Sequence, residues 1–242
     1  MNRQDKAARI LTLSRALKDE HVSVCWNAAR DLAQFGPEAR AALPALAEAL
    51  RSYDATTALW ARYAIAKITG ETSKHLPALI EALADKQRVF PGMAAAALAG
   101  LGAEAKAAVP YLIPELMDPH PDNRWSAAGA LARIGPEARE AAPALMEALR
   151  DVDEKVRWYA AWALSEIGPE AGQALPALIA ALDDPDENVR GYAAKALGRM
   201  GPAAREAVPV LRALLEMEEG AVREQVATAL MRLENSSSQV RE

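Results

Sequence analysis

The chain has 242 residues, of which 51% are hydrophobic, 25% charged and 5% aromatic, with a formal net charge of −5 at pH 7. This is the balance of a folded globular protein, and the negative charge argues against DNA or anionic lipid as a partner of the whole surface. Ala, Leu, Glu and Arg are abundant, so helix is the expected state.

The apolar segments and the single cysteine bear on membrane insertion and on redox compartment. Residues 1–9 are polar and charged, so we expect no signal peptide there. Neither they nor the Ala-rich run 93–99 reach about 18 consecutive apolar residues, so we expect no membrane-spanning segment. The single cysteine, Cys25, cannot form an intrachain disulfide, which fits a reducing, cytoplasmic location.

A period of 33 residues organises the chain. The first column is glycine, with one threonine: Gly36, Thr69, Gly102, Gly135, Gly168 and Gly201. The second is proline: Pro44, Pro77, Pro110, Pro143, Pro176 and Pro209. Leu or Ile and Ala columns keep the same interval, so chance is implausible and a repeat architecture is expected.

Each unit predicts two helices, most clearly in residues 184–211. The sequence Asp184-Pro-Asp caps the first helix, because its carboxylates accept free amide protons at a helix start. Gly201 ends that helix in the left-handed conformation, and Pro202 opens the second helix, where no N–H is needed. Pro209 lies seven residues further on, so the second helix is expected to be kinked or broken there.

This unit resembles the HEAT repeat, especially the short HEAT-like repeats of the phycobilin-lyase type. The string Val-Arg-x-x-Ala-Ala-x-Ala-Leu-x-x-Ile-Gly occurs almost whole at 156–168 and 189–201. The resemblance implies an all-α, right-handed α-solenoid (alpha-alpha superhelix) of about seven 33-residue helical-hairpin repeats. We expect a single solenoid over 1–234 and a disordered, Ser-rich tail over 235–242.

Two charged columns also follow the period. The acidic column is Asp19, Asp85, Asp118, Asp151 and Asp184, and the basic one is Arg124, Arg157, Arg190 and Arg223. In the earlier repeats the basic position holds Cys25, Ala58 and Pro91. The resemblance implies that such Asp and Arg residues brace neighbouring repeats.

A helical wheel of the fifth repeat separates a core side from a free side. The core side holds Val156, Ala160, Ala163, Leu164 and Ile167, and the free side holds Trp158, Tyr159, Trp162, Ser165 and Glu166. In similar solenoids the free side lines the concave surface. Eight aromatic residues map to it: Trp26, Trp60, Tyr63, Trp125, Trp158, Tyr159, Trp162 and Tyr192.

These rings predict a binding surface, because each can bury about 150–250 Å² and together they exceed an ordinary apolar patch. The alternative is that the rings pack on one another or on a neighbouring helix and stiffen the array. The same side carries six cations, Arg30, Lys67, Arg133, Lys195, Arg199 and Arg232, against Glu166 and Glu224, or about +4. The alternative role for these cations is that their stems shield the rings.

The third and fourth repeats have little bulk on the free side, at Gly92, Met93, Ala96, Ala99, Gly100 and Gly129. With Trp60 and Tyr63 on one flank and Trp125 and Arg133 on the other, this predicts a notch. The alternative is a degenerate repeat whose helix start is spoiled by Pro91.

Catalytic motifs are absent: the sequence has no phosphate loop, HExxH or Cys-x-x-Cys. His21, His75 and His120 lie about a repeat or more apart in different columns, so we expect surface histidines and no metal. Cys25 is expected to be a buried, inert thiol. We therefore predict no enzyme activity, no cofactor and no catalytic residue.

Three functions stay open. The first is a scaffold whose concave face holds a protein or peptide partner, acidic or extended, with aromatic and Arg anchors. The second is a nucleic-acid binder resembling HEAT-like DNA glycosylases, with rings stacking on bases. The third is a lyase or chaperone-type subunit that binds a flat ligand in the notch. The acidic net charge counts against the second, although the local charge of about +4 keeps it open.

Overall fold

The computed structural model describes residues 2–85 and 89–235, and within these ranges it contains α-helices and 3₁₀-helices but no strand. The fold is an all-α solenoid of helical hairpins, as the repeat predicts. The chain divides into two compact units, Met1–Ala105 and Lys106–Glu242. Each is described by itself, so the prediction of one continuous solenoid over 1–234 stays a prediction.

The first unit contains α1 (Arg3–Ala16), α2 (Val22–Ala33), η1 (Gly36–Ala42), α3 (Leu43–Ala49), α4 (Ala55–Thr69), α5 (Thr72–Ala84) and α6 (Pro91–Leu101). The boundary falls within η2 (Gly102–Ala108). The second unit continues with α7 (Val109–Glu115), α8 (Pro121–Ile134), η3 (Gly135–Ala141), α9 (Ala142–Ala148), α10 (Glu154–Ile167), η4 (Gly168–Ala174), α11 (Leu175–Ala180), η5 (Ala181–Asp183), α12 (Glu187–Met200), η6 (Gly201–Ala207), α13 (Val208–Met217) and α14 (Gly220–Asn235).

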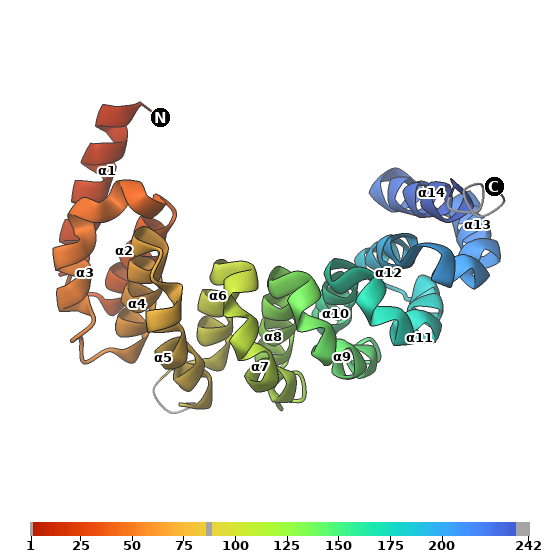
Figure 1. Cartoon of the computed structure of the whole chain (residues 1–242), viewed down its shortest axis with the longest axis horizontal. Helices are drawn as coiled ribbons and strands as arrows, with labels where there is room; N and C mark the ends of the chain where they lie inside the picture. The colour runs from red at the N-terminus through yellow and green to blue at the C-terminus, as the bar shows by residue number, and fades with distance from the viewer. Residues whose placement is uncertain (1, 86–88, 236–242) are drawn as a thin grey trace. The chain divides into compact units, whose positions relative to one another are not determined.

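The helices of each unit form two rows. In each repeat we call the helix that precedes the residue of the glycine column the A helix, and the helical segment that follows this residue the B segment. In the second unit the A helices α8, α10, α12 and α14 pack side by side, with α7, α9, α11 and α13 in the B row (Figure 1). In the first unit α2, α4 and α6 form the A row. Along the described residues, six A helices are each followed by a B segment, with α1 before them and α14 after them, which agrees with about seven repeats.

The core lies between the two rows. The predicted core residues of α10 are fully buried: Val156, Ala160, Ala163, Leu164 and Ile167 are each 0% exposed. The helical wheel therefore assigned the core side correctly. We call the opposite side of the A helices, marked in α10 by Trp158, Trp162 and Glu166, the A face.

The ends of the A helices follow the predicted chemistry. Asp186 caps α12, its Oδ1 accepting the amide protons of Asn188 at 2.9 Å and Val189 at 3.1 Å. Gly201 ends the helix at φ 63° and ψ −140°, a region that is open essentially to glycine alone. The glycine column therefore sets the ends of α8, α10 and α12.

The B segments are broken, as predicted from the second proline column. In the sixth repeat the seven-residue 3₁₀ segment η6 is kinked at Ala204 (φ −98°, ψ 18°), and α13 begins after it at Val208. Pro209 thus occupies the first turn of α13, where its missing N–H costs no hydrogen bond.

The second repeat departs from this pattern for a local reason. Thr69 stands in the glycine column and cannot take the positive φ, so α4 ends one residue later at Gly70, with φ 75°. The following segment, α5, then forms one α-helix of 13 residues with Pro77 inside it.

The role implied by the resemblance is confirmed for three arginines of the basic column, which brace neighbouring repeats, whereas Arg223 donates to the carbonyl oxygens of Leu215 and Glu218. Arg157 donates from Nε to Asp184 Oδ2 at 2.8 Å and from Nη2 to Oδ1 at 3.0 Å, 27 residues along the chain. Its Nη1 also donates to the carbonyl oxygen of Asp151 at 2.9 Å. The hydrogen bonds to Asp184 raise the pKa of Arg157.

Two further arginines make the same brace. Arg124 donates to both carboxylate oxygens of Asp151, at 2.6 and 2.7 Å, and Arg190 donates to Glu218 at 2.5 Å. Burial acts to raise the pKa of Asp151, but hydrogen bonds from Arg124 and the Asp153 amide outweigh it, and the pKa is lowered.

Cys25 replaces the bracing arginine in the first repeat. Its thiol donates to the carbonyl oxygen of Asp19 at 3.2 Å, the position that Arg157 contacts in its own repeat. The side chain is buried, and this burial raises the pKa of the thiol. Both observations fit the predicted inert cysteine.

One stretch, Pro91–Glu115, is long and apolar enough to cross a membrane by length and composition alone. The expectation from sequence counted only unbroken apolar runs and missed it. In the structure the stretch is not one straight helix, because Gly102 (φ 62°) and Ala105 (φ −88°, ψ 15°) divide it into α6, η2 and α7. An 11-residue helix such as α6 is about 16 Å long, roughly half the thickness of a bilayer core.

At the carboxyl end, α14 extends to Asn235, the first residue of the predicted tail. The rest of that prediction, residues 236–242, lies outside the described residues.

Candidate functional site

Five aromatic residues on the A face of the second unit form one continuous group, which we call the ring cluster: Trp125, Trp158, Tyr159, Trp162 and Tyr192. Trp125 of α8 lies 5.4 Å from Tyr159 of α10, centroid to centroid. Tyr159 contacts Trp158 at 4.8 Å and Trp162 at 5.7 Å. Trp158 and Trp162 then reach Tyr192 of α12 at 6.3 and 6.4 Å. The cluster crosses three consecutive A helices, and each ring is half-buried.

Local contacts hold the cluster in place. A Cβ on Gly129 would lie 3.1 Å from the Tyr159 ring, so the absence of a side chain there lets the ring lie against α8. The Trp125 indole donates from Nε1 to Asp122 at 3.0 Å. The Nε1 atom of Trp158 is buried and has no hydrogen-bond partner among the described residues, so the indole is more deeply embedded than an outward-facing position implies.

A charged group borders the cluster. Glu166 accepts a hydrogen bond from Lys195 Nζ and another from Arg199 Nη1, each at 2.8 Å. Burial acts to raise the pKa of Glu166, but these two bonds outweigh it, and the pKa is lowered. Lys195 also lies 5.4 Å above the Tyr192 ring, a cation–π contact. Arg133 is exposed at the other end of the face.

Two of the predicted ring positions are wrong. Trp60 and Tyr63 are buried, at 6% and 5% exposure, although the helical wheel placed them on the free side. Tyr63 fills the space above Gly100, where a Cβ would overlap its ring, and Trp60 packs edge to face on Tyr63 at 5.5 Å. The packing alternative therefore holds in the first unit, where α6 offers Gly and Ala and the rings supply the missing volume.

Trp26 keeps a half-buried position in the first unit. It stacks on Trp60 at 6.4 Å, and the Arg30 guanidinium lies 5.4 Å above its ring. Arg30 in turn contacts Asp31 at 3.5 Å, so its charge is partly balanced. This cation covers a ring, as the shielding alternative for the basic residues supposes.

The notch predicted at the third and fourth repeats joins residues of both units, Trp60 and Tyr63 from the first and Trp125 and Arg133 from the second. Within the first unit, Gly100 is covered by Tyr63. Within the second, Gly129 is covered by Tyr159. At Gly100 and Gly129 the space left by the missing side chain is therefore filled by a ring from the neighbouring A helix.

Two polar residues also differ from prediction. Ser165, placed on the free side, is fully buried, and its hydroxyl donates to the carbonyl oxygen of Trp162 at 2.8 Å, within its own helix. His75, expected at the surface, is only 7% exposed, whereas His21 and His120 are exposed as predicted. His75 stands in a column that is otherwise alanine, so helix periodicity alone could not reveal its burial.

Sequence reasoning missed a hollow of about 360 Å³ between α12 and α14. Its lining residues are Tyr192, Lys195, Ala221, Glu224, Gln225, Thr228, Ala229 and Arg232. Tyr192 belongs to both this hollow and the ring cluster, and Lys195, which lies above the Tyr192 ring, also lines the hollow, so the two features are adjacent on one face. The 33-residue columns contained the signal, because aromatic residues stop after Tyr192.

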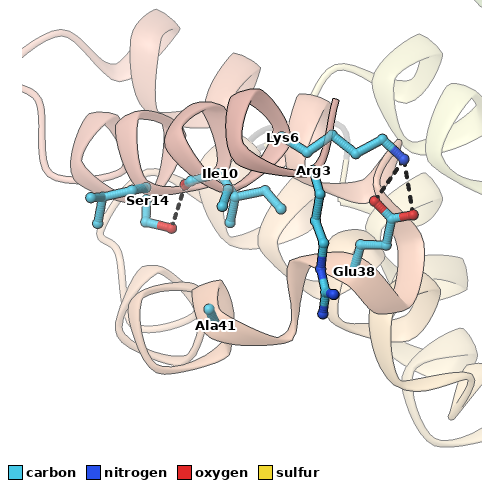
Figure 2. A pocket seen from close by; sticks show the side chains of 8 residues that line it. Arg3, Lys6, Ile10, Ser14, Glu38 and Ala41 are labelled. Atoms are coloured by element: carbon cyan, nitrogen blue, oxygen red, sulfur yellow. Dashed lines mark hydrogen bonds and ion pairs between the residues drawn. The ribbon is translucent and has the colours of Figure 1, made fainter. Parts of the chain in front are cut away.

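A second hollow, of about 640 Å³, lies between α1 and η1 in the first unit (Figure 2). Lys6 and Glu38 form an ion pair at its edge at 2.9 Å, and Ile10 and Ala41 supply apolar lining. In the second unit η4 packs against η3 of the preceding repeat, whereas η1 packs against α1, which is one continuous α-helix.

In residues 2–85 and 89–235, no group of three or more His, Cys, Asp or Glu residues is placed to hold a metal ion.

Two protein-family models match this chain. A model described as HEAT repeats matches residues 109–177 and 175–240, more than half of the chain. A model described as the PBS lyase HEAT-like repeat matches residues 24–52. A comparison with curated protein sequences finds no match.

Among solved structures, the chain is similar to an engineered protein from the Northeast Structural Genomics Consortium, at 25% identity and a TM-score of 0.61, covering 94% of this chain and 97% of that one. A designed armadillo repeat protein, 21% identical with a TM-score of 0.58 over 92% and 98%, shares the fold. The complex of CpcE and CpcF of phycocyanin lyase from Nostoc sp. PCC7120 is 25% identical, with a TM-score of 0.50 over 93% and 94%.

Proposed function

Because this chain belongs to the HEAT repeat family, we propose that it is a non-catalytic scaffold that holds a protein or peptide partner on the A face of α8, α10 and α12. The observation that carries the proposal is the ring cluster, which is continuous over three repeats and half-buried on the side away from the core. Trp, Tyr and Arg are the residue types that dominate the energy of protein interfaces.

The chemistry of the face favours an extended, acidic segment as the partner. Arg133, Lys195 and Arg199 border the rings, and Glu166 fixes two of these cations in position. A preformed arrangement lowers the side-chain entropy that is lost on binding. The cations then select for carboxylates, while the rings supply the apolar contact area.

The comparisons support a protein as the partner. The similar phycocyanin lyase structure is a complex of two chains, CpcE and CpcF. A nucleic-acid role is less well supported, because the net charge of the chain is −5. The ring packing also stiffens the array, and this contribution is compatible with binding on the exposed edges of the rings.

The proposal is tested by a pull-down with the full chain as bait. The double variant Trp158→Ala/Trp162→Ala removes two rings of the cluster, and Glu147→Ala changes an exposed B-row residue as the matched control. A partner retained by wild type and by Glu147→Ala but lost with the double variant supports the A face. A partner retained equally by all three, with the double variant folded by circular dichroism, contradicts it.

A further inference from the structure

The ring columns stop abruptly at the last A helix. One column reads Ser126, Tyr159, Tyr192 and Gln225, and another reads Gly129, Trp162, Lys195 and Thr228. In the groove between α10 and α12 the rings of Trp158 and Trp162 reach Tyr192. In the next groove, between α12 and α14, the chain supplies no ring to meet the other side of Tyr192.

The hollow of about 360 Å³ lies in that groove. Tyr192 forms one wall, and Gln225 and Thr228 of α14 stand where a continued pattern would place rings. Gln225 leans over Gly191, where a Cβ would overlap its amide, so its side chain lies along α12 instead of filling the groove. The volume falls at the lower end of small-ligand sites, about 300–1,000 Å³, which suits a single large side chain with its neighbours.

The cation beside Tyr192 favours a negative group. Lys195 lines the hollow and lies 5.4 Å above the Tyr192 ring. Its Nζ also pairs with Glu166 at 2.8 Å, which fixes the position of the ammonium group. A carboxylate next to an inserted ring would lie beside this ammonium group.

We propose that the groove between α12 and α14 binds an aromatic side chain of the partner, stacked on Tyr192, with a neighbouring carboxylate of the same peptide beside Lys195. The inserted ring would extend the ring cluster into the groove between α12 and α14. Among the described residues of the second unit, this is the groove between neighbouring A helices that contains no ring opposite Tyr192. The inference rests on the proposed function and narrows the partner to a segment in which an aromatic residue is flanked by Asp or Glu.

A methylated-ammonium ligand fits the same surface less well. Aromatic cages for such cations need several rings around an open space. Here the ring centroids of the cluster lie 4.8 to 6.4 Å apart and the rings pack on one another. Among the described residues that line the hollow, Tyr192 is the only aromatic one. The ammonium group of Lys195, 5.4 Å above the Tyr192 ring, also opposes a cation.

The test uses fluorescein-labelled peptides and fluorescence anisotropy on the full chain. The probe is Asp-Glu-Trp-Asp-Glu, and its matched controls are Asp-Glu-Ala-Asp-Glu and Lys-Arg-Trp-Lys-Arg. We expect saturable binding of the probe, at least about tenfold weaker binding of the alanine peptide and none of the basic peptide. Absence of saturable binding of the probe up to about 1 mM overturns the inference.

Filling the hollow locates the site. Thr228→Trp and, independently, Gln225→Tyr supply the missing ring from the chain itself, and Ala213→Trp adds a ring to an exposed position of α13 as the control. We expect each filling variant to weaken probe binding at least about tenfold and the control to leave it unchanged. Unchanged affinity in a folded filling variant overturns the inference.

The outcomes separate this inference from the proposed function. A partner lost with Trp158→Ala/Trp162→Ala but retained by Thr228→Trp and Gln225→Tyr leaves the proposed function in place and overturns the inference. A partner retained by all these variants contradicts the proposed function itself.

Discussion

Arg157 of one repeat and Asp184 of the next are joined by two parallel hydrogen bonds, of 2.8 and 3.0 Å, and their side chains are only 14% and 9% exposed. A bidentate pair in this position links successive repeats rigidly. The ring cluster on α8, α10 and α12 depends on that spacing, because its contacts cross from repeat to repeat.

Removing the brace should destabilise the second unit. We expect Arg157→Ala to cost about 3 kcal/mol, because it leaves the Asp184 carboxylate buried without its partner. The matched control is Arg150→Ala, whose ion pair with Glu147 is 3.5 Å long and has side chains 71% and 75% exposed, and it should cost less than about 1 kcal/mol. Urea unfolding of the full chain measures both, and equal midpoints for the two variants would contradict the role of the brace.

Core and face residues should differ in stability effect. Leu164→Ala should cost roughly 2–5 kcal/mol and Trp60→Ala roughly 3–5 kcal/mol, because both side chains are buried. Trp158→Ala should cost less, near the roughly 0.5–1.5 kcal/mol of an aromatic pair plus partial burial. The order is read from urea midpoints, and it is wrong if Trp158→Ala proves the most damaging of the three.

His75 should make stability depend on pH. Burial, followed by the charges of Arg62 and Lys74, lowers the pKa of its imidazole below 6.5, while Glu71 acts in the opposite direction. Below pH 6.5 the unfolded chain therefore binds more protons at His75 than the folded chain does. The contribution of His75 to the free energy of unfolding has its full value above pH 6.5 and decreases as the pH falls through the lowered pKa of folded His75.

The variant His75→Ala places at this position the residue found in the other repeats and should flatten the stability profile between about pH 7 and 5. The matched control is His120→Ala, which removes an exposed histidine. Thermal unfolding followed across this range gives the comparison, and a wild-type profile identical to that of His75→Ala rules out the effect.

Nucleic acid should not bind under physiological conditions. We expect no gel shift with single- or double-stranded oligonucleotides at low micromolar protein and about 0.15 M salt. Binding through these cations would weaken steeply with salt, with a log–log slope of about −0.9 per phosphate on duplex DNA. A stable shift at that salt concentration would reverse the ranking of partners.

The repeat frame could be predicted from sequence because the glycine column, the proline column and the capping aspartates each have a local physical cause. The stop at Gly201, the cap at Asp186 and the restart before Pro209 all depend on residues within a few positions. The brace between Arg157 and Asp184 lies 27 residues apart in sequence, and it was predicted through the resemblance.

The site was predicted less completely because burial on the A face depends on the neighbouring repeat. Tyr63 is buried because Gly100 lies opposite it, and Tyr159 lies against Gly129 for the same reason. A helical wheel treats each helix alone and cannot detect such pairs. The ion pairs of Glu166 with Lys195 and Arg199 could not be predicted from a count of charges either, because such a count uses the residue types and not their positions.

The central claim is that the A face of α8, α10 and α12 is where the partner binds. Its most direct test is the affinity of the partner, once identified by pull-down, for wild type, Trp158→Ala, Arg199→Glu and Glu147→Ala. We expect Trp158→Ala to weaken binding by about thirtyfold, equivalent to about 2 kcal/mol. Arg199→Glu should mainly slow association and change its salt dependence. Glu147→Ala, in the B row, should match wild type. Equal affinities of wild type and Trp158→Ala would contradict the account and leave the ring cluster with a structural role alone.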